Sequence, residues 1–279
     1  MKKISRRSFL AASGLTIAAL ALTACGGSAS TASSAASSVA ASSEAASTSA
    51  AAAELTTVEA GKLTMATNAA FPPYEMTTDA GAFEGIDIDT AQAIADKLGL
   101  ELQIDDMDFD AALLSVQQGK ADIAMAGVTV TDERKNVMDF SDSYATGIQS
   151  IIVPEGSDIA SPDDLAGKMI GTQRGTTGYI YCSDDFGDDA VVAYDDGLTA
   201  VQALNNGQVD AVVIDNAPAK EFVAANPGLV LLDTSYAEED YAIGMAKGSS
   251  LEAAVNAALE ELKADGTLQS IVDKYITAE

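Results

Sequence analysis

The fold is decided by the stretch GKADIAMA at residues 119–126, in which a glycine turn leads directly into a short apolar run. A helical pattern over 110–118 precedes it, so the order is helix, glycine turn and strand. The same order returns in GQVDAVVI at residues 207–214, after a helical pattern over 198–205. Any α/β protein contains several such units, but a repeat of this kind suggests two related lobes.

The residues that follow the two apolar runs predict a binding site. Gly127, Val128 and Thr129 follow the first run, and Asp215 follows the second. In open α/β sheets, ligands bind beyond the carboxyl ends of the strands. Two such strand ends that face each other would form a cleft.

The composition excludes several classes of function. The 279-residue chain is 48% hydrophobic, which supports a folded body with one large core or two of ordinary domain size. Its net charge of -27 repels phosphate backbones and anionic lipid headgroups, so we do not expect it to bind nucleic acid. The absence of histidine removes the Ser-His and Cys-His catalytic pairs and the commonest zinc ligand. We expect neither a metal nor a cofactor.

The start of the chain predicts export. Residues 1–24 have a basic beginning and then a short apolar run, which is the pattern of a signal peptide and is too short for a membrane-spanning helix. The run ends in LTAC at residues 22–25, which resembles the lipobox of bacterial lipoproteins, so we expect the thiol of Cys25 to carry a lipid. SRRSFL at residues 5–10 also resembles a twin-arginine signal, and the export route stays open.

A low-complexity segment follows the cysteine. Ser, Ala and Thr dominate the chain as far as residue 53, and we expect residues 25–57 to form a flexible tether behind the lipidated Cys25. Cys182 is then a lone thiol, which we expect to be packed.

Seven short motifs lie in order between residues 58 and 277. Each is weak alone and the ordered set is strong: TNAAFPPYE at 67–75, GIDID at 85–89, AGVTVTDER at 126–134, DFS at 139–141, GTT at 175–177, DAVVID at 210–215 and LKADGT at 262–267. In this order they resemble the polar amino-acid solute-binding proteins of ABC importers, which are family 3 of the bacterial solute-binding proteins within the periplasmic binding protein superfamily.

The resemblance implies the two-lobe α/β fold of the type II periplasmic binding proteins, in which each lobe is a mixed sheet flanked by helices. Lobe 1 would contain residues 58–149 and 247–279, and lobe 2 would contain residues 150–246. The runs 150–153 and 242–246 are apolar enough to be the two hinge crossings between the lobes.

The resemblance also implies how the two ends of a free amino acid are bound. Arg134 would bind the ligand carboxylate with paired hydrogen bonds, to which Thr129 and the backbone of Gly127 add donors, and Asp215 would bind the ammonium group. The residue pattern alone leaves two other readings open. Arg134 would then be a solvated arginine in the first turn of a helix, and Asp215 would cap a helix.

Further contacts follow from the same resemblance. Thr176 and Thr177 precede a helical segment whose free N–H groups can bind an anion, so we assign both to the carboxylate, with a plain turn and helix cap as the other reading. Phe71 and Phe109 match the aromatic positions that sandwich the ligand side chain. Both phenylalanines stand at positions that are poor ones for deep burial.

One position departs from the family pattern. Asn68 stands where members that bind basic or amide side chains often carry aspartate, and a neutral amide cannot neutralise a ligand ammonium. We expect a polar uncharged or small amino acid rather than a basic one, although Asp79, Glu84 or Asp87 could still approach the cleft. The complete expected site is Asn68, Phe71, Phe109, Ala126, Gly127, Thr129, Arg134, Gln173, Thr176, Thr177 and Asp215.

Together these features predict an extracytoplasmic, lipid-anchored monomer that binds an amino acid between its lobes and delivers it to the membrane subunits of an ABC importer. The ligand would stabilise closure, because the residues for its two ends lie on different lobes. One alternative is an exported lyase related to the cyclohexadienyl dehydratases, with Glu75 as its proton donor. The other is a ligand-sensing module that acts through a partner.

Overall fold

The computed structural model describes residues 55–276, which belong to one compact unit, Ala51–Glu279. The expected signal peptide, Cys25 and the tether as far as residue 54 lie outside the described residues, as do residues 277–279. Leu55 packs against the hydrophobic core and the Val58 amide donates to Asp122 Oδ1 (2.7 Å), so residues 55–57, expected as the end of the tether, lie against the folded body.

The first sheet has five strands in the order β5–β1–β6–β14–β7. β1 is parallel to β5 and β6, whereas β14 runs antiparallel to both of its neighbours. We call this sheet and its helices lobe 1. Its strands are β1 (Lys62–Thr67), β5 (Glu101–Asp106), β6 (Ile123–Ala124), β7 (Met138–Phe140) and β14 (Gly244–Ala246).

The second sheet repeats this plan in the order β10–β9–β11–β8–β12, and we call it and its helices lobe 2. β9 is parallel to β10 and β11, and β8 runs antiparallel to β11 and β12. A further strand, β13, pairs with β8 outside this path. The strands are β8 (Ala145–Pro154), β9 (Ile170–Gln173), β10 (Val191–Tyr194), β11 (Ala211–Asp215), β12 (Leu229–Leu231) and β13 (Ala237–Tyr241).

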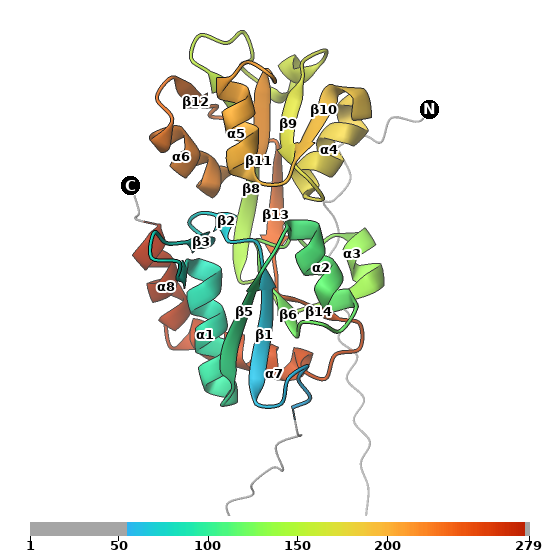
Figure 1. The fold of residues 1–279 in the computed structure, drawn as a ribbon, viewed down its shortest axis with the longest axis vertical. Coiled ribbons are helices and arrows are strands. Elements are labelled where there is room, and N and C mark those ends of the chain that lie inside the picture. Colours follow the sequence, from blue (N-terminus) through green and yellow to red (C-terminus); the bar gives the residue numbers. More distant parts are fainter. Residues whose placement is uncertain (1–54, 277–279) are drawn as a thin grey trace, which may run out of the picture. The chain divides into compact units, whose positions relative to one another are not determined.

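Helices flank each sheet, so the expected α/β architecture is confirmed (Figure 1). In lobe 1, α1, α7 and α8 pack against one another, and in lobe 2, α4 packs on β9, β10 and β11. The remaining elements include the small sheet β2–β3–β4. Bounds are α1 (Ile86–Leu98), α2 (Phe109–Gln117), α3 (Asp132–Val137), α4 (Thr177–Phe186), α5 (Gly197–Asn205), α6 (Asn216–Ala225), α7 (Glu252–Ala264), α8 (Thr267–Tyr275), η1 (Pro162–Leu165), η2 (Asp188–Ala190), β2 (Ala70–Phe71), β3 (Glu75–Thr77) and β4 (Phe83–Glu84).

The continuous apolar runs of the sequence are strands buried on both faces, as parallel strands between two layers of helices must be. In β11, Val212 and Ile214 join the core that contains α5 and α6. Ala211 and Val213 point to the opposite face and join the core that contains the buried, free thiol of Cys182 on α4.

The two copies of the repeat occupy equivalent places, because β6 and β11 are the third strands of their sheets. Gly119 and Gly207 end the preceding helices with φ angles of 65° and 67°, a left-handed conformation that side chains rarely adopt. The aspartate three residues later ties each turn to the neighbouring strand: Asp122 accepts from the Thr64 amide at 2.8 Å and Asp210 from the Met169 amide at 2.7 Å.

The hinge is an antiparallel pair formed by β13 and the first half of β8, which run between the two sheets (Figure 1). The runs expected as crossings lie elsewhere. Residues 150–153 are paired with β11 and β12 inside the second sheet, and residues 244–246 are β14 of the first sheet. The apolar runs mark strands buried inside a sheet, whereas both hinge segments alternate between buried and exposed residues.

Gly85, which precedes α1, offers a test of how the β2–β3 loop is held. A Cβ atom built on Gly85 would lie 2.1 Å from the Tyr74 carbonyl oxygen, where the backbone must shift to make room. We expect Gly85→Ala to lower the free energy of unfolding in urea by more than about 3 kcal/mol.

Gly81→Ala is the matched control. It has a comparable positive φ of 78° and no atom within 4 Å of the added Cβ, so the cost is that of backbone strain alone, about 1–2 kcal/mol. Equal losses in the two variants would contradict the clash.

Candidate functional site

A pocket with about 420 Å³ of space between atoms lies where strand ends of the two sheets meet the hinge. All eleven residues predicted from the sequence line this pocket, and their contact with a ligand stays a prediction. Four lining residues were not predicted. The complete lining is Asn68, Phe71, Glu75, Phe109, Ala126, Gly127, Thr129, Arg134, Gln149, Gln173, Thr176, Thr177, Ile214, Asp215 and Tyr241.

Arg134 is buried in the pocket wall, with 8% of its surface exposed, and is not a solvated arginine. Its amide is held by the cap residue Thr131 at the start of α3, and its guanidinium lies 5.3 Å from the centre of the Phe109 ring. Nη1 donates to the Thr129 carbonyl at 2.7 Å and Nη2 to the Gly175 carbonyl at 3.1 Å.

No carboxylate forms an ion pair with Arg134 within residues 55–276. Burial lowers the pKa of Arg134, yet an arginine stays protonated in proteins. A buried charge with no carboxylate in contact is costly, although Glu239 attracts it from farther away, and three of the five guanidinium N–H groups remain free of protein carbonyls. The pocket therefore has a site for an anion.

The donors expected to assist Arg134 are engaged elsewhere. The Gly127 amide donates to Asp87 Oδ2 at 3.0 Å, and the Thr176 hydroxyl donates to the Gln173 carbonyl at 2.8 Å while capping α4. The hydroxyls of Thr129 and Thr177 donate to Glu239 at 3.2 and 2.9 Å. The engagement of Thr176 matches the turn and helix cap that the sequence left open, whereas Asp87 and Glu239 lie too far away in the chain for the sequence to reveal them as acceptors.

Asp215 has the capping role that the residue pattern left open. One carboxylate oxygen accepts from the Ala217 amide at 3.3 Å, and the other accepts a short hydrogen bond from the Tyr241 hydroxyl. Burial raises the pKa of Asp215 to about 7, against the effect of these two hydrogen bonds. Its carboxyl lines the pocket, so a ligand cation placed there would stabilise the ionised form.

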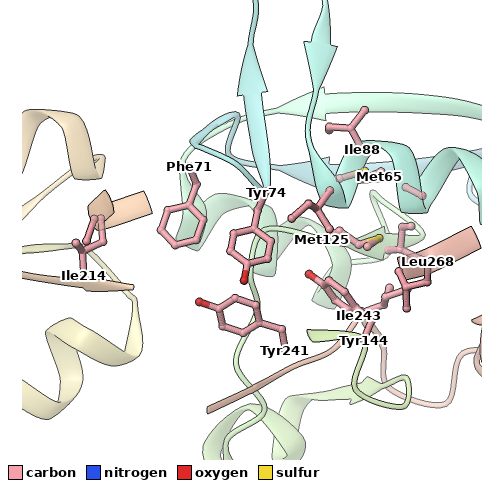
Figure 2. Close-up of a cluster of buried hydrophobic side chains, with 14 of the residues drawn as sticks. Met65, Phe71, Tyr74, Ile88, Met125, Tyr144, Ile214, Tyr241, Ile243 and Leu268 are labelled. Carbon is pink, nitrogen blue, oxygen red and sulfur yellow. The ribbon is translucent and has the colours of Figure 1, made fainter. Parts of the chain in front are cut away.

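Aromatic rings form one wall of the pocket. Phe71 stacks on Tyr74 with ring centroids 5.9 Å apart, and Tyr74 meets Tyr241 edge to face at 5.4 Å (Figure 2). Phe71 and Phe109 are 9% and 5% exposed, so both are buried, contrary to what their sequence positions suggested. The lobes cover them, and an interlobe surface leaves no local pattern in the sequence.

Asn68 and Gln173, both expected in the site, meet across the pocket. Gln173 Nε2 on lobe 2 donates to Asn68 Oδ1 on lobe 1 at 2.8 Å, and Asn68 Nδ2 donates to the Met107 carbonyl at 2.9 Å. With the Arg134–Gly175 bond, this contact joins the two lobes, so the structure is a closed form.

Two buried carboxyl groups adjoin the pocket with no cation in contact: Glu75 is part of its lining, and Asp87 lies beside Glu75. Asp87 accepts from the Gly127 amide and from the Tyr144 hydroxyl at 2.8 Å, and no N–H donates to Glu75. Burial and the adjacent Asp87 raise the pKa of Glu75 well above its usual range, and burial raises that of Asp87 to about 6. These shifts favour the neutral form of Glu75 beside the ionised form of Asp87.

The four unpredicted lining residues had partial signals. Ile214 directly precedes Asp215, Glu75 ends the TNAAFPPYE motif, and Gln149 is a polar residue beside an apolar run. Tyr241 lies one residue before the expected second crossing. Among residues 55–276, no group of Cys, Asp and Glu is suited to a metal ion, and no helix is long and apolar enough to cross a membrane.

Comparisons with known proteins agree with this geometry. The model of the bacterial extracellular solute-binding proteins, family 3, matches residues 63–278. The probable histidine-binding protein of Neisseria gonorrhoeae is 32% identical over 279 residues, covering 96% of this chain and 95% of that protein.

Solved structures agree as well. The arginine-, lysine-, histidine-binding protein ArtJ from Geobacillus stearothermophilus has a TM-score of 0.75 at 35% identity, covering 78% of this chain and 96% of that chain. An ancestral arginine-binding protein bound to glutamine has a TM-score of 0.75 at 41% identity, covering 78% and 99%.

The raised pKa values predict how stability depends on pH. Asp215 and Asp87 have folded pKa values of about 7 and 6, above the ordinary 3.8, so the folded protein binds more protons than the unfolded chain between these limits. The free energy of unfolding of the ligand-free protein is therefore expected to fall as pH rises from 5 to 8, by at least about 1 kcal/mol.

Urea unfolding across this pH range measures the effect. Asp215→Asn keeps an oxygen that can cap α6 but cannot titrate, so its slope should be smaller than that of the wild type. An unchanged slope in this variant would show that Asp215 does not titrate in this range.

Proposed function

The chain belongs to the bacterial extracellular solute-binding proteins of family 3, and we propose that it binds a free amino acid in the pocket between its lobes. The two-lobe periplasmic-binding-protein fold expected from the sequence is confirmed by the matching structures. Proteins of this family are extracytoplasmic, and the relatives are amino-acid-binding proteins rather than enzymes.

The unpaired guanidinium of Arg134 carries the proposal. A ligand carboxylate would supply the missing counter-charge, and a planar guanidinium can bind it with two parallel hydrogen bonds. Phe109 supports the guanidinium from one side and the Thr129 carbonyl fixes one nitrogen, so the remaining N–H groups are oriented before the ligand arrives. The amide groups at the start of α4 add the positive end of a helix to this site.

Asp215 is proposed to bind the ligand ammonium. It lies at the pocket wall, where burial raises its pKa and disfavours its ionised form. A cation beside it would lower this pKa. The Tyr241 hydroxyl donates to the same carboxylate, which leaves lone pairs of Asp215 for an N–H donor from the ligand.

The side-chain end of the pocket favours a polar uncharged or small amino acid. Asn68 and Gln173 offer neutral donors and acceptors, and the nearby Glu75 is neutral. A basic amino acid is the second candidate, because Glu75 lines the pocket and the relatives include proteins named for histidine and arginine. Such a ligand would have to ionise a fully buried carboxyl group, which costs free energy.

Delivery to an ABC importer is proposed as the next step. The closed form presents both lobes in one arrangement that an importer can distinguish from an open one. We further propose that residues 1–24 direct export and that a lipid on Cys25 holds the monomeric protein at the membrane, with residues 25–54 as the tether. The ligand-sensing alternative would require a signalling partner in place of the importer.

The proposal predicts that Arg134→Ala abolishes ligand-induced stabilisation. A screen of the natural amino acids by thermal shift identifies the ligand, which should add about 2.7 kcal/mol of stability at 100 times its Kd. Arg134→Ala removes charge-assisted hydrogen bonds of roughly 1.5–3 kcal/mol each, so calorimetry should show affinity weakened by more than about 100-fold.

Two further variants make this test specific. Arg134→Lys keeps the charge without the paired geometry and should fall between wild type and Arg134→Ala. Arg174→Ala removes an exposed arginine whose ion pair with Asp195 is solvated, and should leave the affinity within about threefold. Wild-type affinity in Arg134→Ala would place the carboxylate elsewhere.

Asn68→Asp tests the side-chain end of the pocket. The substitution adds a negative charge at the same size, so affinity for lysine and arginine should rise relative to that for uncharged amino acids. Thermal-shift ranking of the same amino acids before and after the substitution measures this. If lysine or arginine already ranks first for the wild type, the preference for uncharged ligands is wrong.

A further inference from the structure

Glu239 is buried behind the pocket and has no direct place in its lining. It lies on the hinge strand β13 with 6% of its surface exposed. One carboxylate oxygen, Oε2, accepts three hydrogen bonds: from Gln149 Nε2 at 3.0 Å, from the Thr177 hydroxyl at 2.9 Å and from the Thr129 hydroxyl at 3.2 Å.

The three donors come from three different parts of the structure. Thr129 follows β6 in lobe 1, Thr177 begins α4 in lobe 2, and Gln149 belongs to the hinge strand β8. The two threonine oxygens lie 3.5 Å apart, so the lobes touch at this point. A separation of the lobes would break at least one of the threonine bonds.

Glu239 determines how two threonine hydroxyls in the pocket lining are oriented. A threonine hydroxyl has one proton, and both Thr129 and Thr177 give theirs to Glu239. Their remaining lone pairs, with the side chain of Gln149, line the pocket. Glu239 therefore fixes the orientation of three lining side chains without touching the ligand itself.

We propose that Glu239 is a positioning residue that favours the closed form, because its carboxylate joins Thr129 of lobe 1 to Thr177 of lobe 2 at the hinge. A glutamate with a structural role alone would stabilise the open and closed forms equally. Here the complete set of bonds exists only when the lobes are closed, so Glu239 acts on the equilibrium between the two forms.

The position of this equilibrium sets the apparent affinity for every ligand. The apparent Kd is the intrinsic Kd divided by the fraction of protein in the competent form. Loss of Glu239 should weaken all ligands by one common factor and leave their ranking unchanged. This consequence rests on the proposed amino-acid binding, whereas the shift toward the open form requires no ligand.

The experiment compares Glu239→Gln with Glu238→Gln, its exposed neighbour on β13. X-ray scattering of the ligand-free proteins comes first. We expect a larger radius of gyration for Glu239→Gln and an unchanged one for Glu238→Gln. Equal radii for wild type and Glu239→Gln would overturn the proposal, whatever the ligand is.

Binding of the ligands found by the thermal-shift screen is measured next. Glu239→Gln replaces charge-assisted hydrogen bonds by neutral ones, so each ligand should bind about tenfold more weakly, with faster dissociation and the same ranking. A changed ranking would mean that Glu239 selects among ligands, directly or through the side chains it orients, and would also overturn the proposal. If the wild type binds no amino acid, the proposed function is wrong. The scattering result would still test the role of Glu239 in closure, because it requires no ligand.

Thr177→Val gives a second route to the same answer, because it keeps the shape of the side chain and removes the hydroxyl. It should raise the radius of gyration as Glu239→Gln does. Combined with Glu239→Gln it should add little, since both variants remove one interaction. Additive effects of the two substitutions would mean that they act separately and would contradict the coupling.

Discussion

The buried guanidinium of Arg134 is the constraint on which the pocket depends. A chain with a net charge of -27 places a cation at the meeting point of its lobes and gives it no carboxylate in contact. The acids nearest the pocket are in different surroundings: burial raises the pKa of Glu75 and of Asp215, whereas Glu239 accepts three hydrogen bonds, which stabilise a carboxylate. The same lining thus contains a cation, Arg134, and an acid, Asp215, which suits a zwitterion.

The same groups that shape the pocket hold the lobes together. Arg134 reaches the Gly175 carbonyl, Gln173 reaches Asn68, and Glu239 joins two threonines. None of these bonds is large by itself, because each replaces bonds to water. They share one geometry, however, and are made or lost together when the lobes move. Closure of the lobes therefore makes these bonds as one set.

The sequence predicted the parts of this structure that depend on local pattern. Spacing in the sequence predicts the glycine turns, the aspartates after them and the strand ends. These features locate the site because β6 and β11 occupy equivalent positions in their two sheets. The hinge could not be located from apolar runs, because its two segments are largely polar: residues 145–149 of β8 are ATGIQ and β13 is AEEDY. The role of Glu239 and the burial of Phe109 depend on contacts between segments far apart in sequence, for which no local pattern exists.

The place of β14 in the first sheet has a consequence for how the chain is made. This strand lies between β6 and β7, although all of lobe 2 separates it from them in sequence. While the ribosome is still producing lobe 2, β7 has no neighbouring strand in its sheet, whereas the strands of lobe 2 are consecutive and can pair as they emerge. The lobe that begins first is therefore completed last, and an incomplete chain carries an open sheet edge that nothing in lobe 1 can cover.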